Sequence, residues 1–252
     1  MSVFSDYSIY YDLLYKDKDY AGESQYVLNA LSTDDKQLNS LLELGCGTGK
    51  HAEFFLQKFN QYKGVDLSED MVMQAKDRLA GKNVDLSIGD VRNFKSNEKF
   101  DAVVSLFHVA SYQIENHDFL SYLKSANENL KSGSLFLFDF WYGPAVLNLK
   151  PSIKIKRMSS EKYFVTRIAE PTCDPQRNLV IVNYEVLIED KANHKHSKII
   201  ESHPMRYYFI PEIKYFLEMS GFDVNETRFE EWMTAQVPSE NSWGVTCITR
   251  KK

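Results

Sequence analysis

Residues 41–50, which read LLELGCGTGK, combine residue types that could bind a charged ligand. A short apolar run leads to an acid and then to three glycines at alternate positions. Alternate glycines allow positive φ angles, so the backbone can pass close to a ligand. After a buried strand, such a turn lies at the edge of the sheet where cofactors bind. The cofactor-binding candidates in this turn are Glu43, Gly45, Cys46, Gly47, Thr48 and Gly49.

Two common nucleotide-binding motifs do not fit this turn. A P-loop places Ser or Thr after its Gly-Lys pair, but His51 follows Lys50 here, and the preceding glycine is one position too close. A dinucleotide fingerprint requires its third glycine where Lys50 stands. An acid two residues before the first glycine would also repel a phosphate and attract an amino group. The turn therefore favours a zwitterionic or cationic ligand, and S-adenosylmethionine has both an ammonium and a sulfonium group.

Two further acids follow predicted strands in the order that a nucleoside site requires. Asp66 ends the stretch YKGVD, where a carboxylate can accept hydrogen bonds from both ribose hydroxyls. Asp90, in IGDVRNF, could accept from the adenine amino group, with Val91 offering its backbone N–H to the ring. Each aspartate alone could instead be a helix N-cap or a turn residue. Together with the glycines, they favour a nucleoside site. The apolar residues that could enclose the adenine are Leu67, Met71 and Leu106.

S-adenosylmethionine is a methyl donor, and a nearby base or hydrogen-bond acceptor would help a protonated nucleophile to accept its methyl group. Three residues are candidates for this catalytic role: His108 and Tyr112 in SLFHVASYQ, and His203 in ESHPMRYYF. Glu201 lies two residues before His203 and so shares its strand face. The alternatives are a strand-end hydrogen bond for His108, aromatic packing for Tyr112, and a solvated edge-strand position for His203.

A second group of residues could line a pocket for the acceptor. Asp139, Trp141 and Tyr142 lie at the end of the fifth predicted strand. Arg206 belongs to a set of basic residues that could hold a diphosphate, and the alternative for this set is a solvated strand face. No His, Cys or Asp residues show the spacing of a metal site, so no metal is expected.

The pattern of the elements that must position these residues changes after Pro144. From Ser40 to Phe140, short apolar runs alternate with helical stripes, which predicts parallel strands covered by helices. From 145 to 210, strand-like segments with period two follow one another without helices, which predicts an antiparallel insert. The helical stripes lie at 52–59, at 71–79 with Ser68 as N-cap, and at 119–130, ended by Gly133.

The expected fold class is α/β, with a doubly wound, mostly parallel, seven-stranded Rossmann-like sheet. Residues 1–144 and 211–252 would form this domain, including an N-terminal helical cap. Residues 145–210 would form an antiparallel β insert between the fifth strand and the last helix, covering the acceptor site. A helix over 211–220 and two final strands would then rejoin the main sheet.

The composition is that of an ordinary globular protein, with 43% hydrophobic and 26% charged residues. The net charge of −5 argues against a nucleic-acid partner, because phosphate binding needs a basic surface. Three widely spaced cysteines favour a reducing compartment over a disulfide framework. With no signal-peptide pattern and no apolar run approaching 18 residues, we expect a cytosolic protein without a membrane partner. An edge strand of the insert could pair between subunits of a homodimer.

Four stretches of the chain together resemble the class I S-adenosylmethionine-dependent methyltransferases: LLELGCGTG, GVDLS, IGDVRNF and FDAVVSLF. More narrowly, the chain resembles the nucleotide-sugar N-methyltransferases that dimethylate amino sugars, through YYDLLYKDKDY, the predicted insert, ESHPMRYYF and DFWYGP. This closer likeness implies N-methylation of a nucleotide-linked amino sugar, a small-molecule acceptor. The alternatives are O-methylation of a sugar or another small metabolite, and a non-catalytic subunit that binds the cofactor.

The resemblance also implies roles for individual residues. It places the three glycines around the methionine part of the cofactor, Asp66 at the ribose, and Asp90 with Val91 at the adenine. Tyr11 and Tyr20, from the N-terminal segment, would close over the cofactor.

Two positions depart from the pattern of the sugar N-methyltransferases. Tyr112 stands where those enzymes have a histidine near the transfer site, and Trp243 stands where they have an arginine. Both positions belong to the predicted acceptor pocket. The resemblance therefore leaves the identity of the acceptor open.

Overall fold

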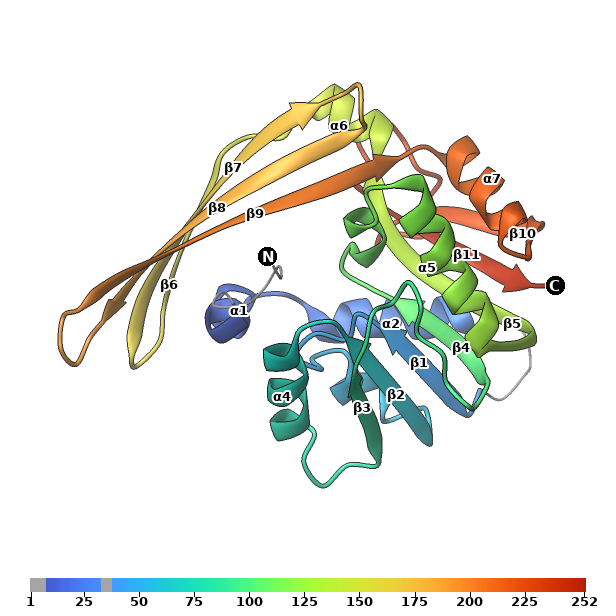
Figure 1. The fold of residues 1–252 in the computed structure, drawn as a ribbon, viewed down its shortest axis with the longest axis horizontal. Helices are drawn as coiled ribbons and strands as arrows, with labels where there is room; N and C mark the ends of the chain where they lie inside the picture. Colours follow the sequence, from blue (N-terminus) through green and yellow to red (C-terminus); the bar gives the residue numbers. More distant parts are fainter. Residues whose placement is uncertain (1–7, 33–37) are drawn as a thin grey trace.

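A computed structural model describes residues 8–32 and 38–252, and a long twisted sheet forms its centre (Figure 1). Among these residues, seven strands form the main part of the sheet in the order β3-β2-β1-β4-β5-β11-β10. Strands β1 to β5 are parallel, and β11 is antiparallel to β5 and β10, which confirms the expected fold class. The strands are β1 (Ser40–Leu44), β2 (Gln61–Asp66), β3 (Val84–Ile88), β4 (Phe100–Ser105), β5 (Leu130–Tyr142), β10 (Phe222–Glu231) and β11 (Gly244–Lys251).

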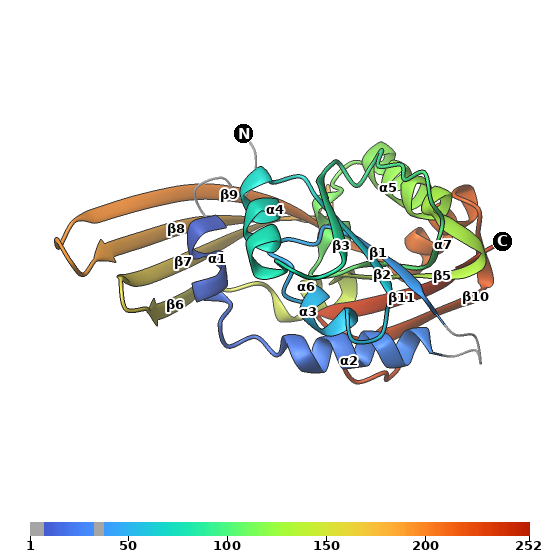
Figure 2. The same ribbon diagram turned by 90° about the horizontal axis from the view of Figure 1, so that it is seen from below.

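Helices cover both faces of the main sheet (Figure 2). Side chains alternate along each strand, so Leu42 packs on one face with Phe119, whereas Leu41 packs on the other with Val27. Ser68 caps α4 by accepting a hydrogen bond from the Met71 N–H, as predicted. The helices are α1 (Ser8–Leu14), α2 (Tyr20–Leu31), α3 (Ala52–Phe55), α4 (Glu69–Arg78), η1 (Val109–Tyr112), α5 (Asn116–Asn129), α6 (Gly143–Leu149) and α7 (Ile210–Met219).

Two predicted helix ends are wrong. The stripe over 52–59 forms a helix only as far as Phe55, because the N–H groups of Asn60 and Gln61 donate to the Asn39 carbonyl and draw the chain into β2. The third stripe ends before Gly133, because Leu130 already pairs with β4 and begins β5.

The predicted insert forms a long antiparallel arm that extends away from the main sheet (Figure 1). Each of its strands pairs antiparallel with the next along the chain, in the sequence β6-β7-β8-β9. Period two along β8 matches the observed burial, since Val180, Val182, Val186 and Ile188 are buried. The four strands are β6 (Lys154–Ser159), β7 (Tyr163–Asp174), β8 (Leu179–Asp190) and β9 (His196–Tyr208).

The arm is not separate from the main sheet. Strand β9 pairs in parallel with the end of β5 through Trp141 with Tyr207 and Tyr142 with Tyr208. Tyr208 is fully buried in the core that also contains residues of β5 and α7. The arm therefore continues the sheet at the point where β5 ends.

Helix α1 lies between the arm and α4 (Figure 2). Its last residue, Leu14, is fully buried against Val165, Val186 and Ile188 of the arm. On the other side, the Gln74 side chain of α4 donates to the backbone carbonyl of Ser8 at 3.2 Å. The N-terminal helix thus bridges two parts of the molecule that are distant in sequence.

None of the helices within residues 8–32 and 38–252 is both long enough and apolar enough to cross a membrane. The three cysteines differ in their environment: Cys46 and Cys247 are buried, and Cys173, on β7, is exposed.

Candidate active site

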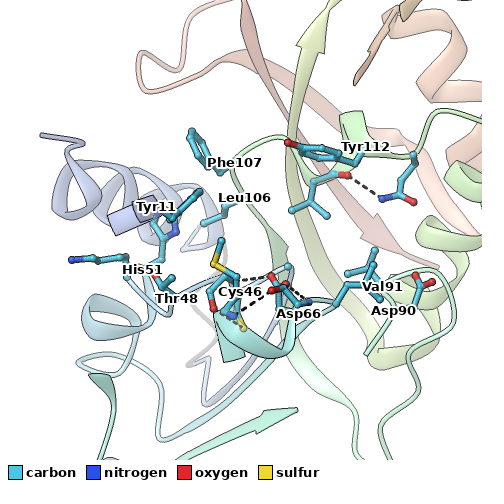
Figure 3. A pocket seen from close by; sticks show the side chains of 18 of the residues that line it. Tyr11, Cys46, Thr48, His51, Asp66, Asp90, Val91, Leu106, Phe107 and Tyr112 are labelled. Atoms are coloured by element: carbon cyan, nitrogen blue, oxygen red, sulfur yellow. Dashed lines mark hydrogen bonds between the residues drawn. The ribbon is translucent and has the colours of Figure 1, made fainter. Parts of the chain in front are cut away.

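A cavity of about 310 Å³ lies beyond the carboxyl ends of β1 to β4, where sheets of this type bind ligands. Ligand pockets typically measure about 300–1,000 Å³. Figure 3 shows Tyr112 and Phe107 on one side of the cavity, with Thr48, Cys46 and Asp66 on the other. The predicted cofactor residues that line it are Tyr11, Tyr20, Gly45, Cys46, Gly47, Thr48, Asp66, Leu67, Met71, Asp90, Val91 and Leu106.

The glycine turn is held against the end of β2 by backbone hydrogen bonds. The N–H groups of Gly45 and Cys46 donate to the carbonyl of Val65 at 2.7 and 3.0 Å. Gly45 has a φ of +83°, and a Cβ atom there would lie 2.5 Å from Cγ2 of Val109. Gly47 has a φ of +53°, and a Cβ there would meet no described atom within 4 Å. Glycine is thus required at position 45 for close packing, and at position 47 it leaves the cavity open.

Asp66, the last residue of β2, directs its carboxylate toward the glycine turn. It accepts hydrogen bonds from the N–H groups of Gly47 at 2.8 Å and Ser68 at 2.9 Å. Burial raises the pKa of Asp66, and the backbone hydrogen bonds oppose that rise. Each carboxylate oxygen can accept more than one hydrogen bond. Asp66 can therefore hold the turn and still accept from two neighbouring hydroxyl groups.

Asp90 follows β3 and lies on the cavity wall. The Arg92 side chain donates to Asp90 at 2.9 Å, and this interaction lowers the pKa of Asp90. Arg92 also forms an ion pair with Asp118, across 3.2 Å. The Asp90 carboxylate is therefore charged and held in place. The apolar residues expected around the adenine share this cavity: Val91, Met71 and Leu106, which are buried, and Leu67, which is 62% exposed.

Two predicted cofactor residues, Glu43 and Gly49, lie behind the cavity wall and do not line it. The Tyr62 hydroxyl donates to Glu43 at 2.6 Å, and Nδ1 of His51 lies 3.7 Å from the same carboxylate. Glu43 is 1% exposed, and burial raises its pKa. From this buried position behind the wall, Glu43 supports the glycine turn. Gly49, with a φ of +74°, packs against Ala75.

The N-terminal helices close one side of the cavity with Tyr11 and Tyr20. Asp12 accepts a hydrogen bond from Oγ1 of Thr48 at 2.8 Å and pairs with Arg78 of α4, which ties α1 to the glycine turn. The Tyr20 hydroxyl is buried and has no hydrogen-bond partner among the described residues. Burial raises the pKa of Tyr20, as do neighbouring carboxylates. The Tyr20 hydroxyl is therefore a protonated donor available to a ligand.

Two of the three catalytic candidates meet at the opposite side of the cavity. Tyr112, at the end of η1, lines the cavity, and its hydroxyl lies 2.8 Å from Nδ1 of His203. Nε2 of His203 lies 3.0 Å from a carboxylate oxygen of Glu201. His203 is 0% exposed. The arm thus brings a histidine and a glutamate behind a tyrosine on the cavity wall.

The third candidate, His108, pairs with a different acid. Its Nδ1 lies 2.6 Å from the carboxylate of Asp139, which also accepts the His108 backbone N–H at 3.1 Å. Burial opposes ionisation of Asp139, but the His108 interactions outweigh it and lower the pKa of Asp139. His108 has a φ of +66°, so this pair holds a strained turn after β4. Neither residue lines the cavity.

The remaining acceptor candidates lie around the junction of β5, β9 and β11, outside the cavity wall. The rings of Trp141 and Trp243 meet edge to face, with centroids 5.6 Å apart. The Tyr142 N–H donates to the Trp243 carbonyl at 3.0 Å. Arg206 is buried, pairs with Glu212, and stacks over Tyr208. Its guanidinium therefore contacts these groups and is not exposed as a phosphate-binding side chain would be.

Several lining residues were not predicted from the sequence. Phe107 has a φ of +65°, which turns its ring into the cavity, and Nζ of Lys18 lies 4.5 Å from the centre of that ring. A positive φ at a non-glycine residue cannot be recognised from residue type. His51 could have been found from its place directly after the glycine turn. The other unpredicted lining residues are Lys50, Ser68, Arg92, Val109 and Gln113.

Residues 41–133 match the model of a protein family described as a methyltransferase domain. The match runs from β1 into β5 and includes the glycine turn, Asp66 and Asp90. These residues are therefore similar to a methyltransferase domain. Within residues 8–32 and 38–252, this domain and the arm contain no group of three or more His, Cys, Asp and Glu side chains that could hold a metal ion.

Individual proteins extend the likeness beyond the methyltransferase domain. The chain is 35% identical over 141 residues to dTDP-3-amino-3,4,6-trideoxy-alpha-D-glucopyranose N,N-dimethyltransferase from Streptomyces venezuelae, covering 55% of this chain and 59% of that relative. It is 24% identical over 217 residues to dTDP-3-amino-3,6-dideoxy-alpha-D-glucopyranose N,N-dimethyltransferase from Streptomyces fradiae, covering 85% of this chain and 82% of that relative.

A solved structure shares the whole architecture. The S-adenosylmethionine-dependent methyltransferase from Clostridium acetobutylicum ATCC 824 superposes with a TM-score of 0.81 at 22% identity, covering 96% of each chain. At this identity, the likeness shows a common fold, including the arm. The match to the first relative spans less than two thirds of that protein's length.

Proposed function

We propose that this chain is an S-adenosylmethionine-dependent methyltransferase that N-methylates a small molecule, a nucleotide-linked amino sugar. The observation that carries the proposal is the cavity between the glycine turn and Asp66, within the methyltransferase domain. The two dTDP-amino-sugar dimethyltransferases named above support the acceptor class, and the second of them is similar over most of the arm as well.

The residues of the cavity suit this cofactor. Gly45 and Gly47 would hold its amino-acid part, because a side chain at 47 would enter the open space. The unpartnered Tyr20 hydroxyl, buried at the same wall, would donate to the cofactor carboxylate. Asp66 would hold the ribose hydroxyls, and Asp90 the adenine amino group. When bound, S-adenosylmethionine supplies a methyl group on a positively charged sulfur.

The protein's own contribution is to position the acceptor and exclude water. The walls include apolar and aromatic side chains, among them Met71, Leu106 and Phe107. Such walls keep water away from a reactive methyl group. Tyr112 lies across the cavity from Asp66 (Figure 3). We expect the acceptor to approach from the side of Tyr112. Holding the reacting atoms in line is the largest task of such an enzyme.

The inner face of the arm suits a nucleotide beyond the amino sugar. The Tyr184 ring meets His203 edge to face at 4.7 Å. The Arg167 guanidinium lies 5.2 Å from the centre of the Tyr184 ring and 5.5 Å from the centre of the Tyr15 ring. Aromatic rings and an arginine are suited to a base and a diphosphate, respectively. This row of side chains begins next to Tyr112, so it supports a nucleotide-linked acceptor.

Two measurements test the proposed function. Isothermal titration should detect binding of S-adenosylhomocysteine, and the absence of binding would remove the proposal. Purified protein is then incubated with S-adenosylmethionine and either a dTDP-linked amino sugar or the matching dTDP-linked hydroxyl sugar. Mass spectrometry should find methyl groups only on the amino sugar. If only the hydroxyl sugar were methylated, the chain would be an O-methyltransferase and the proposed N-methylation would be wrong.

Three finer predictions belong to this proposal. The enzyme would act in the cytosol, the arm would cover the acceptor site, and two chains would pair through β6, the outermost strand of the arm. Analytical ultracentrifugation of the purified chain tests the homodimer directly, since a monomer at micromolar concentration would exclude it.

A further inference from the structure

Three side chains form a hydrogen-bonded row that begins at the cavity and ends inside the arm. Tyr112 is on the cavity wall, His203 lies behind it, and Glu201 follows. The joining distances are 2.8 Å from the Tyr112 hydroxyl to Nδ1 and 3.0 Å from Nε2 to Glu201. The three residues come from η1 and from one face of β9. The junction between β5 and β9 therefore brings them together.

The order of the groups fixes where the protons are. A carboxylate only accepts hydrogen bonds, so the His203 nitrogen that faces Glu201 must carry hydrogen. In a neutral imidazole the other nitrogen, Nδ1, is then an acceptor. Nδ1 consequently accepts from the hydroxyl of Tyr112, which is a residue of the cavity wall. The row is oriented to move a proton from the cavity toward Glu201.

We propose that Tyr112, His203 and Glu201 form a proton relay that deprotonates the acceptor amine. This inference rests on the proposed function, because it names the group that makes an amino-sugar nitrogen nucleophilic. Tyr112 is the catalytic residue, since it is the member that would touch the acceptor. His203 and Glu201 are positioning residues that act through Tyr112.

In total, the relay moves one proton from the acceptor to His203. The acceptor arrives as an ammonium, one of its N–H bonds breaks, and the proton passes to the Tyr112 oxygen. The original Tyr112 hydroxyl proton passes at the same time to Nδ1 of His203. The result is a neutral amine, an unchanged tyrosine and an imidazolium beside the Glu201 carboxylate. That carboxylate stabilises the imidazolium in a fully buried position. The proton returns to solvent when the product leaves.

His108 does not fill this role, although it also follows β4. Its Nδ1 lies 2.6 Å from the carboxylate of Asp139, and His108 does not line the cavity. Its ring instead lies edge to face with Trp141 at the arm junction. The row through Tyr112 therefore has the access to the acceptor that His108 lacks.

Charged and titratable groups of several described elements lie around His203. Tyr112 faces it from η1, Glu201 from β9, and Tyr184 from β8. Arg167 of β7 lies 5.2 Å from the centre of the Tyr184 ring. Of the charged side chains, Glu201 contacts the His203 ring directly, at 3.0 Å from Nε2.

Kinetics as a function of pH test the relay. Tyr112→Phe and His203→Gln should each lower kcat/KM by about 10²-fold near pH 7, the usual effect of losing a general base. The defect should shrink to a few-fold at roughly one to two pH units above the pKa of the acceptor amine, where the amine arrives uncharged. A packing role would lower the rate equally at every pH. Tyr215→Phe and His117→Asn, both at exposed positions, are the matched controls.

Nuclear magnetic resonance tests the orientation of the row without any acceptor. In protein labelled with ¹⁵N at histidine, the signal that His203→Gln removes should show the tautomer with hydrogen on Nε2. Hydrogen on Nδ1 would reverse the row and overturn the relay. S-adenosylhomocysteine binding by each variant confirms that the fold is intact.

The outcomes separate the relay from the function on which it rests. If the wild-type protein methylates no amine, the proposed function fails and the relay fails with it. If the wild-type protein is active and both variants show defects that do not change with pH, only the relay fails. A defect that shrinks to a few-fold at high pH, together with hydrogen on Nε2, supports both.

Discussion

Gly47 and Gly81 share a left-handed backbone, with φ angles of +53° and +78°, but only Gly47 lies on the cavity wall. A Cβ at either position would meet no described atom within 4 Å. Alanine should therefore cost each variant about 1–2 kcal/mol of stability, from backbone strain alone. Gly47→Ala should also weaken S-adenosylhomocysteine binding by about 10-fold or more, because its methyl group enters the ligand space. Thermal unfolding and isothermal titration measure the two effects.

Gly81→Ala is the control that isolates the second effect. It carries the same kind of strain on the far end of α4 and should bind the ligand as the wild type does. Equal affinities for the two variants would show that the ligand does not approach the backbone at Gly47.

Asp66→Asn should weaken binding of S-adenosylhomocysteine by about 10- to 100-fold. Hydrogen bonds to a charged group are worth about 1.5–3 kcal/mol, and the amide loses both the charge and one acceptor oxygen. Isothermal titration near neutral pH measures the change. Asp85→Asn, at an exposed position on β3, should have no effect and serves as the control.

The pKa of Asp66 gives a second test of the same contact. Burial raises this pKa, and the protonated acid accepts fewer hydrogen bonds than the carboxylate. Affinity of the wild type should therefore fall with decreasing pH, beginning above the ordinary aspartate value of about 3.9. Asp66→Asn should lack this fall, and an identical pH profile for both proteins would assign the titration to another group.

At the residue scale, most of the cofactor residues predicted from the sequence line the cavity. The spacing of the glycines and the strand-end acids placed Asp66 and Asp90 correctly on the wall. Glu43 was expected on the wall too, but its side chain turns away to Tyr62. That orientation depends on a partner 19 residues away, which a local motif does not contain.

Helix α1 is held on the glycine turn by one acidic side chain. Asp12 binds Thr48 and Arg78, so Asp12→Asn should loosen the helix by about 1 kcal/mol, the value of one net hydrogen bond. Hydrogen exchange over residues 8–14 should then quicken roughly fivefold, and S-adenosylhomocysteine should dissociate faster.

Asp77→Asn, at an exposed position on α4, is the matched control for Asp12→Asn. Exchange in the control should stay at the wild-type rate. If Asp12→Asn also exchanged at that rate, other contacts of α1, such as those of Leu14 with the arm, would hold the helix in place.

At the element scale, hydrophobic periodicity predicted the strands of the main sheet and of the arm, but it missed η1 and α6 and did not show where some helices end. The stripe at 119–130 continues one residue into β5, because Leu130 serves as a helix-face residue in the pattern and as a partner of Phe100 in the sheet. A residue that is apolar in both settings gives no boundary signal. The end of α5 is decided by strand pairing, which is a long-range interaction.

The whole molecule should unfold as one unit that the cofactor stabilises. At 100 times its dissociation constant, S-adenosylhomocysteine should add about 2.7 kcal/mol. For a chain of this size, that raises the Tm by roughly 5–10 °C. Fluorescence of Trp141 and Trp243, at the arm junction, should report the same midpoint as far-ultraviolet circular dichroism. If the fluorescence midpoint did not shift when the ligand was added, the arm and the main sheet would unfold separately.

At the scale of the molecule, the main sheet and the arm were both predicted, but their connection was not. The alternation of strands and helices implies the parallel sheet, and period two implies the antiparallel arm. The parallel contact between β5 and β9 involves only two residue pairs. A pairing this short leaves no pattern in the sequence. It nevertheless places β9 so that His203 lies behind Tyr112 at the cavity wall.

The distribution of the three cysteines makes the unmodified protein convenient for spectroscopy. Burial raises the pKa of the thiols of Cys46 and Cys247, so both should react slowly with maleimides, whereas Cys173 is open to solvent on the arm. A single fluorophore can therefore be attached to β7 without removing any native residue. Changes in its emission during substrate addition would report movements of the arm in real time.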